Sequence, residues 1–205
     1  MTRVYFVRHA QPEHDWEEDR TRPLTEEGKK DSAIVLEFLK DKKIDAFYCS
    51  PYKRSMDTIA EAADFFTKEI ITDERLRERE KGLDGNNHGM FRKRWADHNY
   101  HEEGGESIAM VQKRNIEALN EILSDNTDKD IVIGTHGTAL STILNFYDNN
   151  FGCEDFLRII DWMPYIIELD FESSCNEMES ECPSYSFKLI GKQKHCYIEK
   201  KFKGK

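Results

Sequence analysis

The chain has 205 residues, 40 of them acidic and 30 basic, and a formal net charge of −10. This length suits one substantial hydrophobic core, so we expect a single domain over residues 1–205. The negative charge disfavours nucleic acid and anionic membranes as partners, because both would be repelled at long range. A small anionic ligand fits this charge only where basic side chains gather in one place.

The N-terminal residues lack the features of a signal peptide, since the apolar run after Met1 is interrupted at Arg8 and His9. No later segment approaches the roughly 20 apolar residues of a membrane span. The five cysteines are odd in number and scattered, which indicates reduced thiols rather than a disulfide framework. We therefore expect a cytoplasmic protein.

Strands and helices are predicted to alternate along the chain. Residues 3–7 are a β-branched and aromatic run, typical of a buried strand. Thr25 precedes two glutamates and an apolar series at helical spacing, which predicts a helix that Thr25 caps. The predicted strands are 3–7, 44–49, 69–72, 131–133, 165–171 and 185–190, and the predicted helices are 25–40, one from Ser50-Pro51 onward, one from Ser107 onward and one ending at about Tyr147. This order predicts an α/β fold, a three-layer α/β/α sandwich with a mostly parallel central sheet.

Three segments lack a regular pattern. Residues 11–23 and 172–184 are polar and are predicted as loops. Residues 83–105 are rich in His, Arg and Trp without a clear core face, so we expect a lid over the site. Within them, Phe91 and Trp95 fit either the core or an apolar wall for a substrate.

Side chains suited to binding an oxyanion follow three of the predicted strands. Arg8 and His9 follow the first strand, Arg54 lies just after the second, and His136 follows the strand at 131–133. In an open α/β sheet, ligands bind beyond the carboxyl ends of the strands. These residues therefore predict a nucleophile with cationic clamps for a phosphoryl group, without a metal ion or a P-loop.

Six motifs in the same order and spacing resemble those of the histidine phosphatase superfamily, the phosphoglycerate-mutase-like proteins. The motifs are Arg8-His9-Ala10, Pro23-Leu24-Thr25-Glu26-Glu27-Gly28, Ser50-Pro51-Tyr52-Lys53-Arg54-Ser55-Met56-Asp57-Thr58, Leu76-Arg77-Glu78-Arg79-Glu80-Lys81-Gly82, Gly104-Gly105-Glu106-Ser107 and Thr135-His136-Gly137. The resemblance covers residues 4 to about 145 and points to the phosphatase branch. This sequence differs from the family pattern at Ala10, usually a glycine, and at Asp15, where many members have an asparagine.

The resemblance implies a role for each residue of the site. His9 takes up the phosphoryl group, while Arg8, Arg54 and His136 bind its oxygens. Glu78 falls at the position of the proton donor, with Glu80 as the alternative. No cofactor is implied, and the irregular spacing of His88, His98 and His101 does not favour a metal site.

The expected function is hydrolysis of a small anionic phosphomonoester. A cofactor-dependent phosphoglycerate-type mutase is one alternative, but only about 20 residues separate Gly82 from Gly104, where the mutases of the family usually carry more chain. A phospho-ligand-binding protein with little activity is the other. The sequence does not indicate an oligomeric state.

Overall fold

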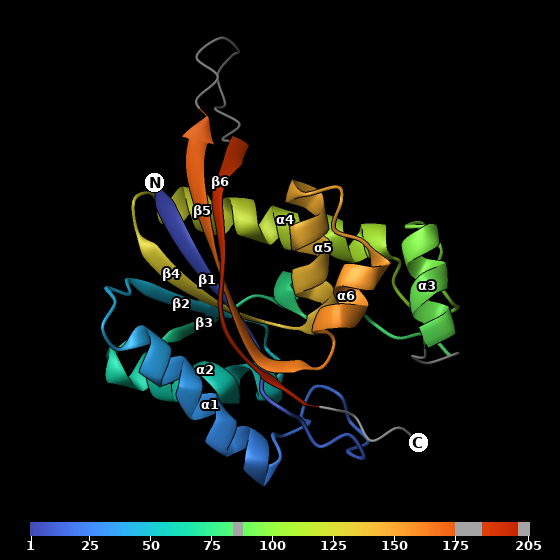
Figure 1. The fold of residues 1–205 in the computed structure, drawn as a ribbon, viewed down its shortest axis with the longest axis horizontal. Coiled ribbons are helices and arrows are strands. Elements are labelled where there is room, and N and C mark those ends of the chain that lie inside the picture. The colour runs from blue at the N-terminus through green and yellow to red at the C-terminus, as the bar shows by residue number, and fades with distance from the viewer. Residues whose placement is uncertain (84–87, 175–185, 201–205) are drawn as a thin grey trace.

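The chain forms one six-stranded sheet, seen in a computed structural model that describes residues 1–83, 88–174 and 186–200 (Figure 1). The strands are β1 (Thr2–Arg8), β2 (Ala46–Cys49), β3 (Ile70–Thr72), β4 (Asp130–Thr135), β5 (Trp162–Ser174) and β6 (Ser186–Glu199). They lie in the order β3-β2-β4-β1-β5-β6. The first four in this order are parallel, as predicted, whereas β5 is antiparallel to both β1 and β6.

The antiparallel strands β5 and β6 are longer than predicted. They pair with each other from Trp162 opposite Glu199 to Ser174 opposite Ser186, with register shifts on the way. β6 continues past the predicted end at residue 190 through a lysine-rich stretch, a composition that suits an edge strand because charges discourage further pairing. Of the predicted loop at 172–184, residues 172–174 belong to β5 and the rest lies outside the described residues.

Helices cover both faces of the sheet, which confirms the three-layer α/β/α architecture. The helices are α1 (Glu26–Leu39), α2 (Lys53–Phe65), α3 (His88–Ala96), α4 (Ile108–Asp125), α5 (Gly137–Tyr147) and α6 (Cys153–Ile159), with a short 3-10 helix at Glu74–Leu76. α1 and α2 lie on one face, and α4, α5 and α6 lie on the other (Figure 1). Of the described part of the chain, no helix is both long enough and apolar enough to span a membrane.

The central strands are apolar on both sides because each side packs on a helical layer. In β1, Val4 and Phe6 join the core beneath α4, α5 and α6, while Tyr5 and Val7 join the core beneath α1 and α2. The predicted cap of α1 is confirmed, since the Thr25 hydroxyl accepts a hydrogen bond of 2.8 Å from the Gly28 amide.

Helix α2 begins at Lys53, later than the predicted start at Ser50-Pro51. The apolar residues of its buried face are Ile59, Ala62 and Ala63. Met56 and Ala60 are only partly buried, whereas three polar residues of this helix are buried. These are Arg54, Ser55 and Thr58. Arg54 donates to His9 and Thr58 accepts from the Ala10 amide, contacts that an apolar pattern does not reveal.

Segment 83–105 contains helix α3, and residues 84–87 lie outside the described part. The segment has a core face that its sequence pattern does not show, because Trp95 is 8% exposed and packs in the core against Phe156. Arg94 is also buried and pairs with Glu102. So short a helix buries too few side chains to show a helical period. Opening and closing of the segment as a lid stays a prediction.

Candidate active site

The three predicted strand ends meet at one edge of the sheet. β1 pairs with β4 in a register that places Arg8 beside Thr135, and the His9 amide extends this ladder by donating to the Thr135 carbonyl at 3.1 Å. β2 lies on the other side of β4, where the Ser50 amide donates to the Gly134 carbonyl at 3.0 Å. Since parallel strands end at the same edge, the residues that follow them are brought together. The rings of His9 and His136 are 5.2 Å apart, centroid to centroid.

His9 presents an unprotonated ring nitrogen. Its Nδ1 lies 2.7 Å from the Ala10 carbonyl oxygen, which can only accept, so Nδ1 carries the proton. Nε2 therefore carries no proton, and its lone pair accepts a hydrogen bond from Arg54 Nε at 3.3 Å. Burial lowers the pKa of His9 well below its usual value, and the charges of Arg54 and Arg8 lower it further. At neutral pH the ring is uncharged, and Nε2 is the ring nitrogen whose lone pair could act as a nucleophile.

Ala10 is compatible with this backbone. It is not among the described residues with positive φ, so the glycine usual in the family is not required for conformational freedom. Its amide donates to the Thr58 hydroxyl at 2.9 Å, which ties the chain after His9 to α2.

Arg8 is buried and held by backbone carbonyls. Its Nη1 donates to the Ile159 carbonyl at 2.7 Å and to the Trp162 carbonyl at 3.2 Å. Its Nε is buried without a hydrogen-bond partner among the described residues. Burial lowers the pKa of Arg8 to about 10, against the opposing charge of Glu78. A Cβ atom at Gly137 would lie 3.2 Å from the guanidinium carbon, so the glycine lets the N-terminus of α5 approach Arg8 closely.

Arg54 joins the site from the first turn of α2 and is also buried. Its Nη1 donates to the Asp19 carbonyl at 2.7 Å and lies 3.3 Å from the Asp19 carboxylate, which also contacts Nη1 of Arg22 at 3.0 Å. Burial lowers the pKa of Arg54, and the charge of Asp19 opposes this. Sequence reasoning missed Asp19 and Arg22, because nothing distinguishes them from the other charges of the loop. Asp15 is exposed and does not line the cavity.

His136 is fully buried beside His9. Its Nε2 lies 2.7 Å from the Ser50 hydroxyl. Burial lowers the pKa of His136 well below its usual value, as do the charge of Arg54 and the nearby His9, so the ring is neutral. When the hydroxyl donates to Nε2, the ring proton resides on Nδ1, which has no partner within the described part of the chain. That nitrogen can donate to an oxyanion.

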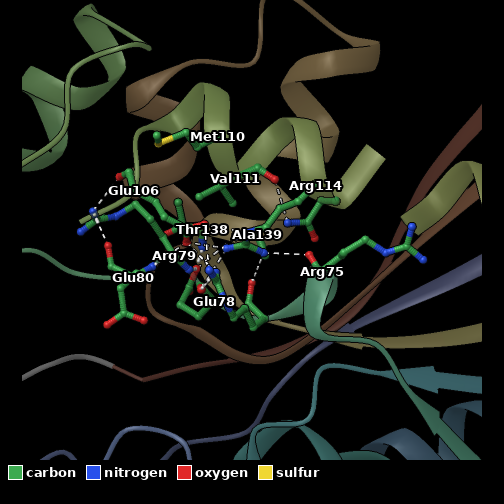
Figure 2. A network of polar contacts seen from close by, with 12 residues as sticks. Arg75, Glu78, Arg79, Glu80, Glu106, Met110, Val111, Arg114, Thr138 and Ala139 are labelled. Carbon is green, nitrogen blue, oxygen red and sulfur yellow. Dashed lines mark hydrogen bonds and ion pairs between the residues drawn. The ribbon is translucent and has the colours of Figure 1, made fainter. Parts of the chain in front are cut away.

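Glu78 reaches the site from the loop after the 3-10 helix (Figure 2). Its carboxylate accepts hydrogen bonds from three backbone amides, which belong to Arg79 at 2.7 Å, Thr138 at 3.1 Å and Ala139 at 3.2 Å. The last two amides lie in the first turn of α5, where a carboxylate is favoured by the helix dipole. Glu80, the alternative acid, is exposed. The structure thus brings all five predicted site residues to one edge, with Glu78 rather than Glu80 fixed against α5.

Arg8, His9, Arg54 and Glu78 line a cavity of about 410 Å³, and the fully buried His136 lies behind His9 outside its lining. Its lining combines cations and carboxylates with an apolar wall that includes Phe91 of α3. The lining residues are Arg8, His9, Pro12, His14, Asp19, Arg22, Arg54, Glu78, Arg79, Glu80, Lys81, Phe91, Gly137, Thr138, Phe156, Ile160 and Met163. Phe91 therefore belongs to the wall, whereas Trp95 belongs to the core. Within the described ranges, no group of three or more His, Cys, Asp or Glu side chains could hold a metal ion.

The model of the histidine phosphatase superfamily (branch 1) matches residues 4–161. The chain therefore belongs to the histidine phosphatase superfamily, as its motifs predict. This membership confirms the predicted class of enzyme, a phosphatase.

Similar proteins include enzymes of more than one activity. Phosphoserine phosphatase 1 of Hydrogenobacter thermophilus is 29% identical over 154 residues, which make up 66% of this chain and 71% of that protein. The 2,3-bisphosphoglycerate-dependent phosphoglycerate mutase of Thermoplasma acidophilum is 44% identical over 55 residues, or 27% of this chain and 28% of that protein. Among solved structures, phosphoserine phosphatase of Entamoeba histolytica in complex with 3-phosphoglyceric acid has a TM-score of 0.70 at 22% identity, covering 92% of this chain and 97% of that one.

The contact of Asp19 with Arg54 predicts that Asp19 weakens anion binding. Asp19→Asn should lower the inhibition constant of vanadate about fivefold, because removing a partly exposed carboxylate near a cation is worth about 1 kcal/mol for an entering anion. Steady-state inhibition measures the constant. Asp15→Asn is the control, since it removes the same charge from an exposed position outside the cavity. A constant that is unchanged or higher in Asp19→Asn would contradict this reading.

Proposed function

We propose that the protein hydrolyses a small phosphomonoester through a phosphohistidine intermediate at His9. The observation that carries the proposal is the neutral His9 ring, whose unprotonated Nε2 accepts from the buried guanidinium group of Arg54, with the charge of the buried Arg8 also acting on the ring. A nucleophile and two cations in one cavity are what phosphoryl transfer requires when no metal neutralises the charge. The similar phosphoserine phosphatases support a small substrate, and the cavity has a suitable size.

In the first step, Nε2 of His9 attacks phosphorus as the bond to the ester oxygen breaks. Arg8, Arg54 and Nδ1 of His136 donate to the phosphoryl oxygens and stabilise the charge that develops on them. Glu78 gives its proton to the departing alkoxide, which leaves as the alcohol. The products are phosphohistidine, the alcohol and the Glu78 carboxylate.

In the second step, water attacks phosphorus while the carboxylate of Glu78 takes up one of its protons. The P–N bond breaks, its electron pair returns to Nε2, and phosphate leaves. The sum of the two steps is ester plus water giving alcohol plus phosphate, with His9 and Glu78 restored. Splitting the transfer in this way lets one carboxyl group serve as acid and then as base.

The alternatives differ in what accepts the phosphoryl group. A mutase would pass it from His9 to a second hydroxyl and has to exclude water meanwhile. The similarity to a phosphoglycerate mutase over 55 residues supports this alternative. A binding protein would form no covalent intermediate. The cytoplasmic location stays a prediction, and the oligomeric state is open.

His9→Ala should lower turnover of phosphoserine at least about a thousandfold, because no neighbouring group can replace the covalent nucleophile. The measurement pairs phosphate release with trapping of acid-labile phosphoenzyme from labelled substrate. The control is His101→Ala, which changes an exposed histidine outside the cavity. Phosphoenzyme formation by His9→Ala at the rate of the unmodified chain would refute the histidine nucleophile.

Chelation of metals should leave activity unchanged. The proposed charge stabilisation comes from Arg8, Arg54 and His136, so prolonged incubation with EDTA followed by gel filtration should not alter kcat. Phosphate release is assayed before and after the treatment. Strong inhibition that added Mg²⁺ or Zn²⁺ reverses would show that a metal takes part in the reaction.

Water should be the main acceptor. We expect release of phosphate from 3-phosphoglycerate or phosphoserine to exceed interconversion of 2- and 3-phosphoglycerate, measured in one preparation with 2,3-bisphosphoglycerate as primer. The physical reason is that a mutase has to retain its phosphorylated intermediate and exclude water from it. Of the other cations that line the cavity, Arg22 pairs with Asp19 and Arg79 pairs with Glu102. Interconversion faster than hydrolysis would favour the mutase.

A further inference from the structure

One guanidinium group holds the main chain of the loop that carries Glu78, which we call the acid loop and define as residues 75–80. Arg114 of α4 donates from Nη1 to the carbonyls of Arg75 and Arg77, both at 2.7 Å, and from Nη2 to the Glu78 carbonyl at 3.0 Å (Figure 2). Hydrogen bonds from a charged donor are stronger than those between neutral groups. Arg114 therefore fixes the acid loop at three points.

Glu106 in turn fixes Arg114. Its two carboxylate oxygens accept from Arg114 Nε at 2.9 Å and Nη2 at 2.8 Å, and from Arg77 Nη1 at 2.6 Å and Nη2 at 3.0 Å. The same carboxylate accepts from the Glu80 amide at 2.9 Å. Burial raises the pKa of Glu106, but hydrogen bonds from Arg114 and Arg77 outweigh it and lower the pKa to about 2. Glu106 thus stays ionised and joins α4 to both sides of the acid loop.

Two glycines allow this close approach. A Cβ atom on Gly105 would lie 2.7 Å from the Gly82 amide nitrogen, and one on Gly82 would lie 2.5 Å from the Glu102 Cβ. No real Cβ contact is so short, so larger residues would push the segments apart. At this separation the Glu106 amide donates to the Glu80 carbonyl at 3.0 Å. Gly82 and Gly105 are thus required because larger side chains would not fit between these two segments.

We propose that Arg114 and Glu106 are positioning residues for Glu78, an inference that rests on the proposed role of Glu78 as the acid. Glu78 is anchored at both ends, because α5 amides hold its carboxylate and Arg114 holds its main chain. Without Arg114 the carbonyls of the acid loop lose their donors and the carboxyl group loses its fixed distance to the leaving oxygen. A displacement near 1 Å is enough to slow a proton transfer about a hundredfold.

A comparison of leaving groups tests this role. Nitrophenolate departs from p-nitrophenyl phosphate without needing a proton, whereas the alkoxide of phosphoserine needs one. For Arg114→Met and Glu106→Gln we expect kcat/KM, which reports the first step, to fall about 10- to 100-fold with phosphoserine and only a few-fold with p-nitrophenyl phosphate. Glu78→Gln should show the same selective loss. The vanadate inhibition constant should change less than about twofold, since Arg8, Arg54 and His136 still bind the phosphoryl group.

The matched control is Glu121→Gln on the same helix. Glu121 contacts the side chain of Arg75 at 2.7 Å but is largely exposed, so its loss should affect neither substrate. Adding Arg114→Met to Glu78→Gln should cause no further selective loss, because the positioned group is already absent. If Arg114→Met does not fold, the isosteric Glu106→Gln carries the same comparison.

Equal losses with both substrates, or a selective loss that persists in full on top of Glu78→Gln, would overturn the positioning role while leaving the phosphatase intact. If Glu78→Gln itself shows no selectivity, Glu78 is not the acid and the inference fails with that assignment. Absence of turnover by the unmodified chain, with vanadate still bound, would instead refute the proposed enzyme activity and the inference that rests on it.

Discussion

The burial of two guanidinium groups beside a neutral histidine is the constraint on which the site depends. Removing a cation from water costs several kcal/mol unless hydrogen bonds replace the lost hydration. Arg8 obtains them from two carbonyls near the end of α6 and the start of β5, and Arg54 obtains them from Asp19. The segment after α5 and the polar loop 11–23 are therefore part of the site, although neither supplies the nucleophile.

The same burial explains how an acidic chain can bind a dianion. The net charge of −10 acts at long range, but salt screens it beyond about 8–10 Å. Inside the cavity the effective dielectric constant is lower, so Arg8 and Arg54 dominate the field that a phosphoryl group experiences. Burial keeps His9 unprotonated, and the charges of these cations lower its pKa further. The burial that makes the cavity locally positive thus also holds the ring neutral.

The sequence predicts those parts of the structure that depend on local pattern. The strand at residues 3–7 and the helix capped by Thr25 are confirmed, because a run of β-branched residues and a capping hydroxyl are local signals. The antiparallel direction of β5 is a property of pairing, which a single strand does not encode. Trp95 could not be assigned to the core beforehand, since its burial depends on residues distant in the sequence. Asp19 was missed because only its tertiary contact with Arg54 distinguishes it.

A sequence motif does not show which of its residues line the cavity and which hold the main chain in place. Gly82, Gly105 and Glu106 lie in the same family-like motifs as Glu78 or next to them, yet the two glycines allow close packing of two segments and Glu106 binds two arginines. Sequence spacing does not distinguish a residue that faces the cavity from one that holds the main chain in place. The two kinds of residue are distinguished by their contacts in the structure. In the acid loop both kinds of contact are made by Glu78, whose side chain lines the cavity while its carbonyl accepts from Arg114 of α4.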